Sequence, residues 1–347
     1  MSDIPCINGR FLHQPVAGVQ RYGREILNGF DRAGYAYEVF RPSSPFSSNK
    51  LAGHAWEQAV LPVQTKGSRV LWSPANSGPV CADNHIVTLH DVGIFPHPEW
   101  FSAPYRMWKR ILIPQMSSRA KKIITVSEFS KKLICNYLHV NPEKVLVVYN
   151  GVDRKRFRPA TTAMIQQVRE KYSISGPYLF ALGSMDPRKN FRRLVDAWNL
   201  CIEQESVAGY ELVIAGGSND NFRDFELGSS SALKFLGYID DDDLAPLYSG
   251  ASGFLFPSLF EGFGLPVVEA MACGTPVLTS NTTALAEIAG DAALTVSPEH
   301  THSIKEGIMQ LLESPALRNR LIDCGYERVK RFDWDRAAAQ IYAHLTG

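Results

Sequence analysis

Residues 253–280 read GFLFPSLFEGFGLPVVEAMACGTPVLTS, which predicts a strand, a loop, a helix and a second strand. The segment GFLFP has the apolar character of a buried strand, and SLFEGFG forms the glycine-containing loop. Pro266 suits the first position of the helix, and Gly274 suits the position just past its end. The segment TPVLTS then predicts the next strand. The stretch therefore indicates one strand–helix–strand unit of a parallel sheet.

The same alternation of strand and helix patterns recurs along the chain. Short apolar, β-branched strands alternating with helices indicate an α/β protein whose parallel sheets are covered on both faces. The predicted strands are HIVTLHD, KKIITVS, KVLVVYN, PYLFALG, YELVIAGG, LKFLGY, GFLFPS and TPVLTS. The predicted helices span residues 18–30, 105–119, 127–137, 191–204, 242–251, 266–273, 301–312 and 333–344.

The length of the chain favours two domains. The 347 residues are 45% hydrophobic and 20% charged, which is a globular composition. The segment NGVDRKRFRPATTAM, after the strand at residues 144–149, is polar, charged and contains proline, so it is the expected linker before a helix near Met164. We expect one domain over residues 1–158 and a second over residues 159–332.

Composition also limits the class of protein. No run approaches the roughly 20 apolar residues of a spanning helix, and MSDIPCINGR lacks the basic and apolar regions of a secretion signal. We expect a soluble, cytoplasmic protein. The six cysteines are scattered without metal-ligand spacing, so they are expected to be reduced and structural.

Charge is distributed unevenly between the two halves. Residues 1–158 carry 21 Lys and Arg against 11 Asp and Glu, a net charge of +10, and the remainder carries 15 against 24, a net charge of −9. Both sets of charges can be solvated surfaces whose sum cancels. Alternatively, the basic half approaches an anionic partner, such as a membrane surface or a phosphate-bearing acceptor.

The loop and helix at residues 258–273 suit a ligand that is rich in oxygen. A glycine loop that enters a helix offers unpaired backbone N–H groups to phosphate or to sugar hydroxyls. A carboxylate beside phosphate would be repelled, so Glu261 before the loop and Glu269 within the helix suit hydroxyl pairs better. The alternative is that Glu261 caps the helix and that Glu269 is a solvated helix residue.

The segment EGFGLPVVE matches the E-x7-E signature of the retaining group 1 (family 4) nucleotide-sugar glycosyltransferases. The chain also resembles this family over TLHDVGIFPHPEWFS, KKIITVSEFSKKLI, KVLVVYNGVD, YLFALGSMDPRKNFRRLVDAW, LVIAGG and EIAGDAAL, in the family's order. The resemblance implies a GT-B fold, with two Rossmann-like domains whose parallel sheets face each other across a cleft. It assigns acceptor binding to residues 1–158, completed by the C-terminal helix at 333–347, and donor binding to residues 159–332.

The resemblance also implies roles for individual residues. Glu261 would contact the transferred hexose, Glu269 the ribose, and the pair Arg188 and Lys189 the donor diphosphate. His90 would contact the donor sugar; its alternative is a core histidine bound to a backbone carbonyl. The implied donor-binding set is Gly18, Gly183, Arg188, Lys189, Glu261, Gly262, Phe263, Gly264, Leu265 and Glu269, and the implied catalytic set is His90, Glu261, Arg188 and Lys189.

The sequence is less specific about the residues that bind the acceptor and about the acidic run at residues 240–243. The acceptor-side candidates are Arg21, Asp91 and Ser127. Alternatively, Arg21 is a solvated surface residue of its helix, and Ser127 is expected chiefly to cap a helix. The run IDDDDLAPLY opens a helix, where acidic residues favour the helix dipole, so we expect no metal there. We also expect no cofactor besides the donor substrate and no binding of nucleic acid.

The family resemblance implies a retaining hexosyltransferase. The segments GSMDPRKN and HDVGIFPHPEWFS resemble bacterial polysaccharide mannosyltransferases, so GDP-mannose is the favoured donor and a glycan or lipid-diphosphate-linked oligosaccharide is the expected acceptor. The basic half suggests peripheral contact with the inner face of the cell membrane. Two alternatives stay open: a hydrolase, epimerase or phosphorylase on the same fold, and a non-catalytic binding module.

Overall fold

The computed structural model describes residues 4–14, 17–44, 46–47, 49–67, 69–204, 207–217 and 232–347. The chain forms two compact units, Met1–Gly151 with Asp333–Gly347, and Val152–Phe332. This boundary lies before the predicted one at residues 158 and 159. The backbone N–H of Val152 donates to the carbonyl of Phe332, so the chain already belongs to the second unit at that point.

The first unit contains a six-stranded sheet of order β2-β1-β3-β4-β5-β6, in which all paired strands are parallel. Strands β4, β5 and β6 were predicted. Strands β1, β2 and β3 were not predicted. The strands are β1 (Cys6–Asn8), β2 (Glu38–Phe40), β3 (Leu71–Ser73), β4 (His85–Thr88), β5 (Lys122–Thr125) and β6 (Val145–Val147).

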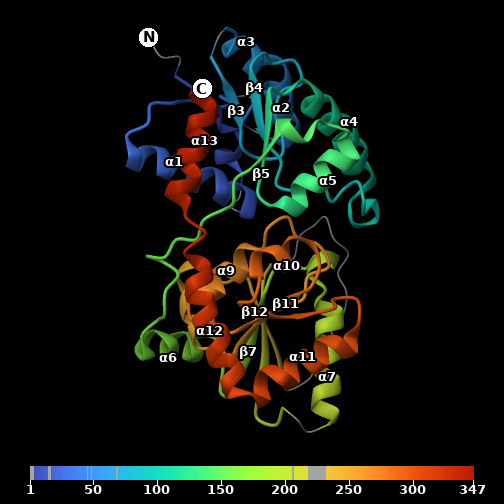
Figure 1. Cartoon of the computed structure of the whole chain (residues 1–347), viewed down its shortest axis with the longest axis vertical. Helices are drawn as coiled ribbons and strands as arrows, with labels where there is room; N and C mark the ends of the chain where they lie inside the picture. The colour runs from blue at the N-terminus through green and yellow to red at the C-terminus, as the bar shows by residue number, and fades with distance from the viewer. Residues whose placement is uncertain are drawn as a thin grey trace. The chain divides into compact units, whose positions relative to one another are not determined.

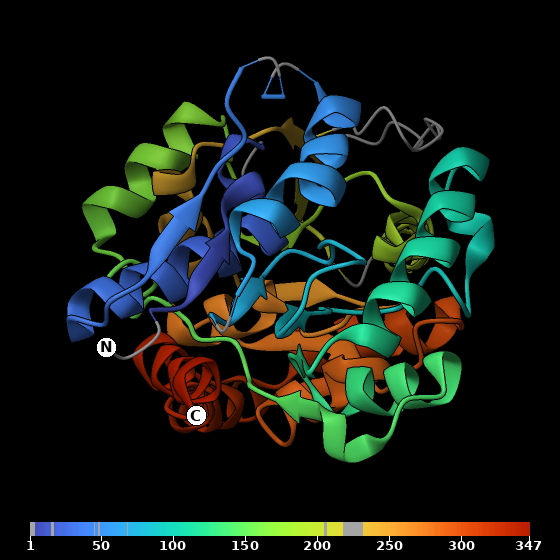
Figure 2. The same cartoon turned by 90° about the horizontal axis from the view of Figure 1, so that it is seen from above.

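Helices cover both faces of this sheet (Figure 1). On one face, α1 and α13 pack together, and the α1 residues Tyr22 and Phe30 meet Trp72 of β3. The other face carries the predicted helices α4 and α5, together with a short helical segment that was not predicted (Figure 2). The helices are α1 (Gly18–Ala33), α2 (Lys50–Ala55), a π-helical turn (Trp56–Val60), α3 (Leu61–Gln64), α4 (Ala103–Arg119), α5 (Glu128–Leu138) and α13 (Trp334–Thr346).

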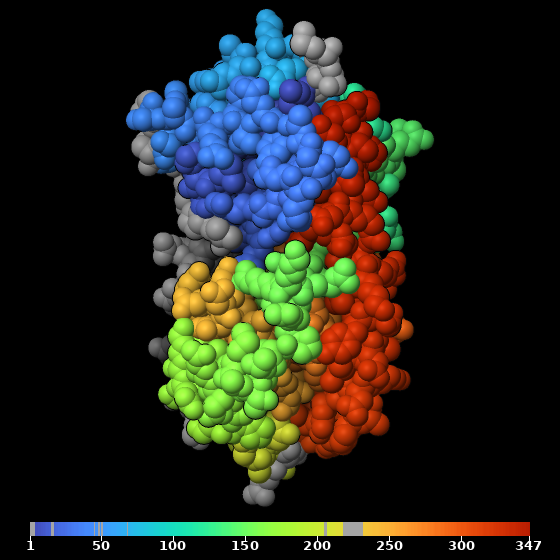
Figure 3. Space-filling model, turned by 90° about the vertical axis from the view of Figure 1, so that its left-hand side faces the viewer, coloured from blue at the N-terminus to red at the C-terminus, as the bar shows by residue number. Residues whose placement is uncertain are grey.

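The C-terminal helix α13 belongs to the first unit, where it lies against the N-terminal segments (Figure 3). Trp334 is buried and its ring meets Tyr22 edge-on at 6.1 Å. Gly151 makes this packing possible, because a Cβ there would lie 2.3 Å from the backbone nitrogen of Trp334. Asp333 caps the helix by accepting a hydrogen bond from the backbone N–H of Arg336.

The second unit contains another six-stranded parallel sheet, of order β12-β11-β10-β7-β8-β9. All of its strands except β12 were predicted. They are β7 (Tyr178–Leu182), β8 (Glu211–Ala215), β9 (Leu233–Gly237), β10 (Gly253–Phe256), β11 (Val277–Ser280) and β12 (Ala293–Val296).

Helices α7 and α11 pack on one face of the second sheet, and α8 lies on the other through Tyr248. Helices α10 and α12 were not predicted, and α8 is shorter than the helix expected at residues 242–251. The helices are α6 (Thr162–Lys171), α7 (Phe191–Glu203), α8 (Leu244–Ser249), α9 (Leu265–Ala272), α10 (Thr283–Ala289), α11 (Thr301–Glu313) and α12 (Pro315–Val329).

The loops after β7 and β8 approach each other closely. Gly216 has φ +143, and a Cβ on it would lie 1.7 Å from the carbonyl oxygen of Gly183. Only glycine permits this backbone conformation and this contact. The close approach sets the position of the loop that begins at Gly183.

The described part of the chain contains no helix that is long and apolar enough to cross a membrane. The six cysteines are free thiols.

Candidate functional site

Lys189 and Glu261 form a direct ion pair in the second unit. Lys189 Nζ donates to Glu261 Oε1 at 2.6 Å, and each side chain keeps 15% of its surface exposed. The Lys189 ammonium also lies 4.8 Å from the centre of the Phe256 ring, at the end of β10. The sequence assigned these two residues to different parts of one ligand, and the structure places them in contact.

The side chain of Arg188 is oriented by a carboxylate two residues earlier in the same turn. Asp186, which is fully buried, accepts hydrogen bonds from Arg188 Nε at 2.8 Å and from Nη2 at 2.5 Å. The carbonyl of Arg188 accepts the backbone N–H of Leu259, which ties this turn to the loop that carries Glu261. Lys189 is therefore the cation that points at Glu261, and Arg188 is oriented by a carboxylate.

Asn190 joins the same two segments. Its φ is +61, and its side-chain amide donates to the carbonyls of Pro257 at 3.0 Å and Pro298 at 2.7 Å. Asn190 stands at the N-cap position of α7 without a side-chain capping bond. Its role is to fix the turn of residues 187–189 against the end of β10.

The loop between β10 and α9 is buried and ordered by packing. Gly262, Phe263 and Gly264 are buried, and the Phe263 ring packs edge-on against Phe332 at 5.5 Å. Gly264 takes the N-cap position of α9 with φ +100, a conformation that favours glycine. The N-cap residue of α9 is Gly264, which makes no side-chain capping bond, so the interpretation of Glu261 as the cap is wrong.

The start of α9 differs slightly from the prediction. The helix begins at Leu265, so Pro266 occupies its second position and not its first. Proline is accepted there because backbone N–H groups in the first turn have no partner within the helix. Gly274 follows the C-cap with φ +75, as predicted.

Glu269 is buried within α9, with 6% of its surface exposed. Its Oε2 accepts a hydrogen bond from the Tyr248 hydroxyl at 3.3 Å. The interpretation of Glu269 as a solvated helix residue is therefore wrong. A buried carboxylate needs hydrogen-bond donors, and the Tyr248 hydroxyl is one of them.

His90 follows β4 in the first unit and is buried. Its Nε2 donates to the carbonyl oxygen of Pro74 at 2.9 Å, which is the contact that the core alternative anticipated. Burial lowers the pKa of the ring, so the imidazole is neutral at pH 7. With the proton on Nε2, Nδ1 is a hydrogen-bond acceptor, and the carbonyl fixes this tautomer.

The remaining first-unit candidates lie on three segments. Asp91 accepts a hydrogen bond from the backbone N–H of Gly93 and so shapes the turn after β4. Ser127 is fully buried and caps α5 by accepting the backbone N–H of Ser130, as predicted. Gly18 is the first residue of α1, and Arg21 lies one turn into that helix.

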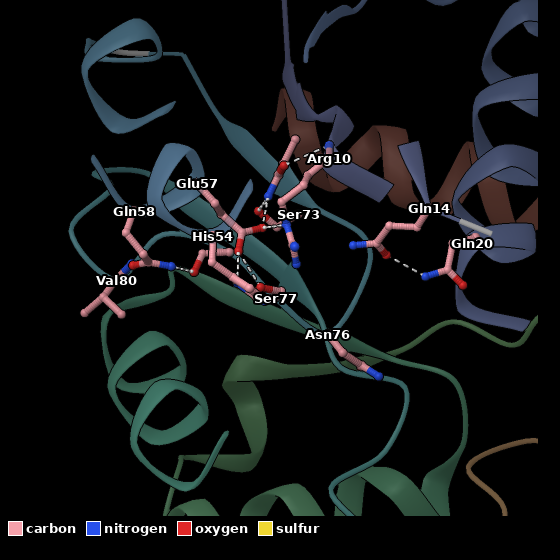
Figure 4. A network of polar contacts seen from close by, with 12 residues as sticks. Arg10, Gln14, Gln20, His54, Glu57, Gln58, Ser73, Asn76, Ser77 and Val80 are labelled. Atoms are coloured by element: carbon pink, nitrogen blue, oxygen red, sulfur yellow. Dashed lines mark hydrogen bonds and ion pairs between the residues drawn. The ribbon is translucent and has the colours of Figure 1, made fainter. Parts of the chain in front are cut away.

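A buried network around Glu57 was not predicted (Figure 4). Glu57 lies in the π-helical turn, is 1% exposed, and accepts hydrogen bonds from Asn8 Nδ2 at 2.8 Å and Ser77 Oγ at 2.5 Å. Arg10 Nε donates to its Oε1 at 3.1 Å. Burial alone would raise the pKa of Glu57, but the surrounding donors and the Arg10 charge outweigh it and lower the pKa to about 2.

Lys109 and Asn76 were also missed. Lys109, on α4, is buried and donates to the backbone carbonyl of Asn76 at 2.7 Å, and burial lowers its pKa to about 8. Asn76 has φ +53, and its side-chain oxygen accepts the backbone N–H of His90. A non-glycine residue in the left-handed region is uncommon, and this one follows β3 at the sheet edge where ligands bind.

The acidic run at residues 240–243 is engaged in ion pairs. Lys171 bridges Asp240 and Asp243, and Arg156 contacts Asp241. Three of these acids form a short 3-10 helix ahead of α8. Asp240, Asp241 and Asp243 therefore each have a cationic partner.

Two family models match the chain. The model for glycosyl transferases group 1 matches residues 165–328, which lie in the second unit. The model for glycosyltransferase family 4 matches residues 80–156, mostly in the first unit.

Curated relatives agree with these models. The chain is 33% identical over 261 residues to an Escherichia coli protein named O-antigen chain mannosyltransferase B, covering 74% of this chain and 68% of that one. It is 29% identical over 280 residues to O-antigen chain mannosyltransferase RfbU of Salmonella typhimurium, covering 77% and 73%.

Solved structures share the fold. Anabaena Alr3699/HepE, crystallised with UDP and glucose, matches with a TM-score of 0.77 at 18% identity over 99% of this chain and 98% of that chain. WaaG, a glycosyltransferase involved in lipopolysaccharide biosynthesis, matches with a TM-score of 0.73 at 18% identity over 99% and 100%. The chain therefore belongs to the group 1 (family 4) glycosyltransferases and has their GT-B fold.

Proposed function

We propose that this protein transfers a hexose from a nucleoside diphosphate to a hydroxyl of a glycan, with retention of the anomeric configuration. The observation that carries the proposal is the Lys189–Glu261 pair, which places a cation and a carboxylate beside the loop that enters α9. The donor occupies the second unit in this proposal. Glu269, buried on α9, takes the ribose hydroxyls, and Glu261 takes hydroxyls of the hexose.

The reaction develops charge at two places. The bond between the anomeric carbon and the phosphate oxygen breaks, so the sugar ring becomes positive and the departing diphosphate becomes more negative. Lys189, with Arg188 oriented by Asp186, stabilises the diphosphate. Because the Lys189 charge is also close to Glu261, donor binding shifts the ammonium from carboxylate to phosphate and frees Glu261 for the sugar.

The acceptor hydroxyl forms the new bond on the face that the diphosphate leaves. Its proton passes to the departing phosphate oxygen, so no enzymatic nucleophile is needed. Neutral His90 supplies a hydrogen-bond acceptor, Nδ1, for a sugar hydroxyl. Lys189 and the backbone N–H groups of the loop take the place that a metal ion has in other transferases, so we propose a reaction without metal or cofactor.

GDP-mannose is the proposed donor. The two curated relatives named above are mannosyltransferases of O-antigen chains, which supports mannose as the sugar and a cell-surface polysaccharide as the product. UDP-linked hexoses and GDP-linked deoxyhexoses are the alternative donors, and the structural neighbour with UDP and glucose supports the first of them.

A donor panel tests both the reaction class and the sugar. We expect GDP-mannose to be turned over faster than other GDP- and UDP-hexoses, with unchanged rates in EDTA. Transfer to an added glycan must exceed release of free mannose. Stoichiometric free sugar or an epimer would instead favour the hydrolase or epimerase alternative, and no turnover of any donor would favour a binding module.

The acceptor side is proposed to meet the cytoplasmic membrane surface through α4. Met107, Trp108 and Ile111 are exposed on this helix, and Arg106 and Arg110 flank them. Exposed apolar side chains with neighbouring arginines are typical of helices that lie in the headgroup region of anionic membranes. This surface fits an acceptor that is attached to a lipid diphosphate.

Vesicle binding tests the α4 proposal. We expect binding to vesicles containing phosphatidylglycerol at low salt, and about tenfold weaker binding after Met107→Ser with Ile111→Ser, because the apolar anchor is lost. Val63→Ser is the matched control, since Val63 is an exposed apolar residue on α3. Equal binding of both variants, or no binding by the wild-type protein, would contradict the proposal.

A further inference from the structure

The sheet of the first unit has a topological switch point between β1 and β3. The chain passes from β1 to β2 on one side and later returns to place β3 on the other side of β1. Segments that leave the carboxyl ends of two such strands diverge, and the crevice between them is the usual ligand site of open parallel sheets. The residues after β1 and β3 therefore frame the place where this unit is expected to hold a ligand.

A small pocket lies at this switch point. Arg10 and Gln14 line it from the segment after β1, Ala75 and Ser77 line it from the segment after β3, and Glu57 lines it from the π-helical turn. The cavity volume is about 10 Å³, which is room for one water-sized group. Only the end of a larger ligand can therefore enter.

The groups that remain available in the pocket are hydrogen-bond donors. Arg10 uses Nε on Glu57, and neither of its terminal nitrogens has a partner among the described residues, although its side chain is only 12% exposed. Gln14 Oε1 accepts from Gln20 at 2.8 Å, which leaves its amide nitrogen on the side of Arg10 (Figure 4). The Arg10 guanidinium and the Gln14 amide can thus both donate hydrogen bonds to an oxygen atom of a ligand.

The net charge of the pocket indicates whether a neutral hydroxyl or an anionic oxygen binds there. The Glu57 carboxylate lies against the Arg10 guanidinium and compensates its charge. The pair therefore offers directed donors without a net charge, and the cavity is too small for a phosphate group. A neutral hydroxyl suits both properties better than an anion does.

The backbone around Glu57 supports a binding role. Trp56–Val60 is a π-helical turn between α2 and α3, and Pro62 in α3 lacks the N–H that would bond back to Gln58. Single π-turns inside helices occur frequently at functional sites because they re-aim a side chain. Here the turn carries Glu57 into the pocket.

We propose that this pocket binds one hydroxyl group of the acceptor glycan, with Arg10 as the specificity-determining contact and Glu57 as the residue that positions Arg10. The proposal rests on the transferase function proposed above. It assigns acceptor selection to the switch point between β1 and β3.

The test measures binding of methyl α-mannoside and its monodeoxy analogues by ligand-observed NMR, with saturating GDP. We expect one analogue to bind the wild-type protein about tenfold more weakly than the parent, because a hydrogen bond to a charged group is lost. Arg10→Gln is expected to weaken binding of the parent glycoside by a similar factor. It is expected to leave binding of that analogue unchanged, since Arg10 and the missing hydroxyl form a single contact.

The matched control is Arg69→Gln, which removes another arginine of this unit that pairs with a glutamate, Glu38, at the surface. It is expected to bind every glycoside as the wild-type protein does. Glu57→Gln tests the positioning role: Arg10 then loses the carboxylate that orients it, so the variant is expected to lose the preference for the parent glycoside over that analogue. A purely structural role of Glu57 would not change this preference.

Several outcomes would overturn the proposal. They are equal binding of all analogues by the wild-type protein, equally weakened binding of the parent and every analogue in Arg10→Gln, no binding of the parent up to its solubility limit, or an unchanged preference for the parent in Glu57→Gln. Donor turnover is measured separately. A protein that binds the glycoside as expected but turns over no donor would contradict the transferase function, and failed glycoside binding with intact donor turnover would contradict the pocket alone.

Discussion

Replacing Lys189 by alanine is expected to lower kcat about 100-fold or more, with the fold intact. The ammonium is the cation beside the loop that enters α9, and in our proposal it stabilises charge that grows on the leaving diphosphate. Removing one preorganised donor to a developing anion costs about this much in other enzymes. Glu261→Gln is expected to cause a comparable loss, because its carboxylate contacts the sugar. Steady-state kinetics with the donor panel measure kcat, and circular dichroism shows whether the fold is intact.

The exchange variant Lys189→Glu with Glu261→Lys separates catalysis from structure. It restores an ion pair between the two positions but reverses the charges that face the ligand. We expect it to fold and to stay inactive. Recovery of turnover in the exchange variant would show that the pair only holds the two loops together. Lys330→Ala, which breaks an exposed ion pair with Glu327 in the same unit, is the control and is expected to keep wild-type kinetics.

Replacing Glu57 by glutamine is expected to lower the free energy of unfolding of the first unit by about 3 kcal/mol at pH 7. The pKa of Glu57 falls from 4.5 to about 2 in the folded chain, and a tenfold change in a proton-binding constant corresponds to about 1.4 kcal/mol. Because the folded pKa is the lower one, this stability is present above pH 4.5 and is lost as the pH falls toward 2. The difference between wild type and variant is therefore expected to shrink below pH 4.5.

Urea unfolding followed by tryptophan fluorescence measures this effect. Five of the six tryptophans lie in the first unit, namely Trp56, Trp72, Trp100, Trp108 and Trp334. Glu38→Gln is the control, because the Glu38 side chain is 54% exposed in its pair with Arg69. A Glu57→Gln variant with a wild-type midpoint, or a difference independent of pH, would show that the buried carboxylate contributes nothing to stability.

Much of the fold follows from local pattern. Strands with four or five apolar residues next to helices, such as β7 and β10, carry enough periodic signal to be predicted, and so do the long helices. The strands β1, β2 and β3 have three residues each and were missed. Strand β6 is as short, but it lies within the longer apolar run KVLVVYN and was predicted. Helices α10 and α12 were missed as well, although Ser314 caps the second of them.

The candidate donor site was predictable in part because its residues lie in a contiguous motif. Glu261, the glycine loop and Glu269 follow one another along the chain, so their spacing and their turn chemistry are visible without a structure. The roles of individual residues in this motif remain proposals. The boundary near Gly151 could not be predicted, because it depends on a backbone hydrogen bond between Val152 and Phe332, far apart in the chain.

Residue types and strand and helix periods indicated the α/β class from the amino-acid order alone, and motifs of consecutive residues carried the resemblance to the family. The pairing of Lys189 with Glu261, 72 residues apart, the burial of Glu269 and the network around Glu57 came only from the tertiary structure. The physical reason is that burial and electrostatic partners arise when distant segments meet at the edge of a sheet. A glutamate inside a helical pattern looks the same in sequence whether it faces water or a buried arginine.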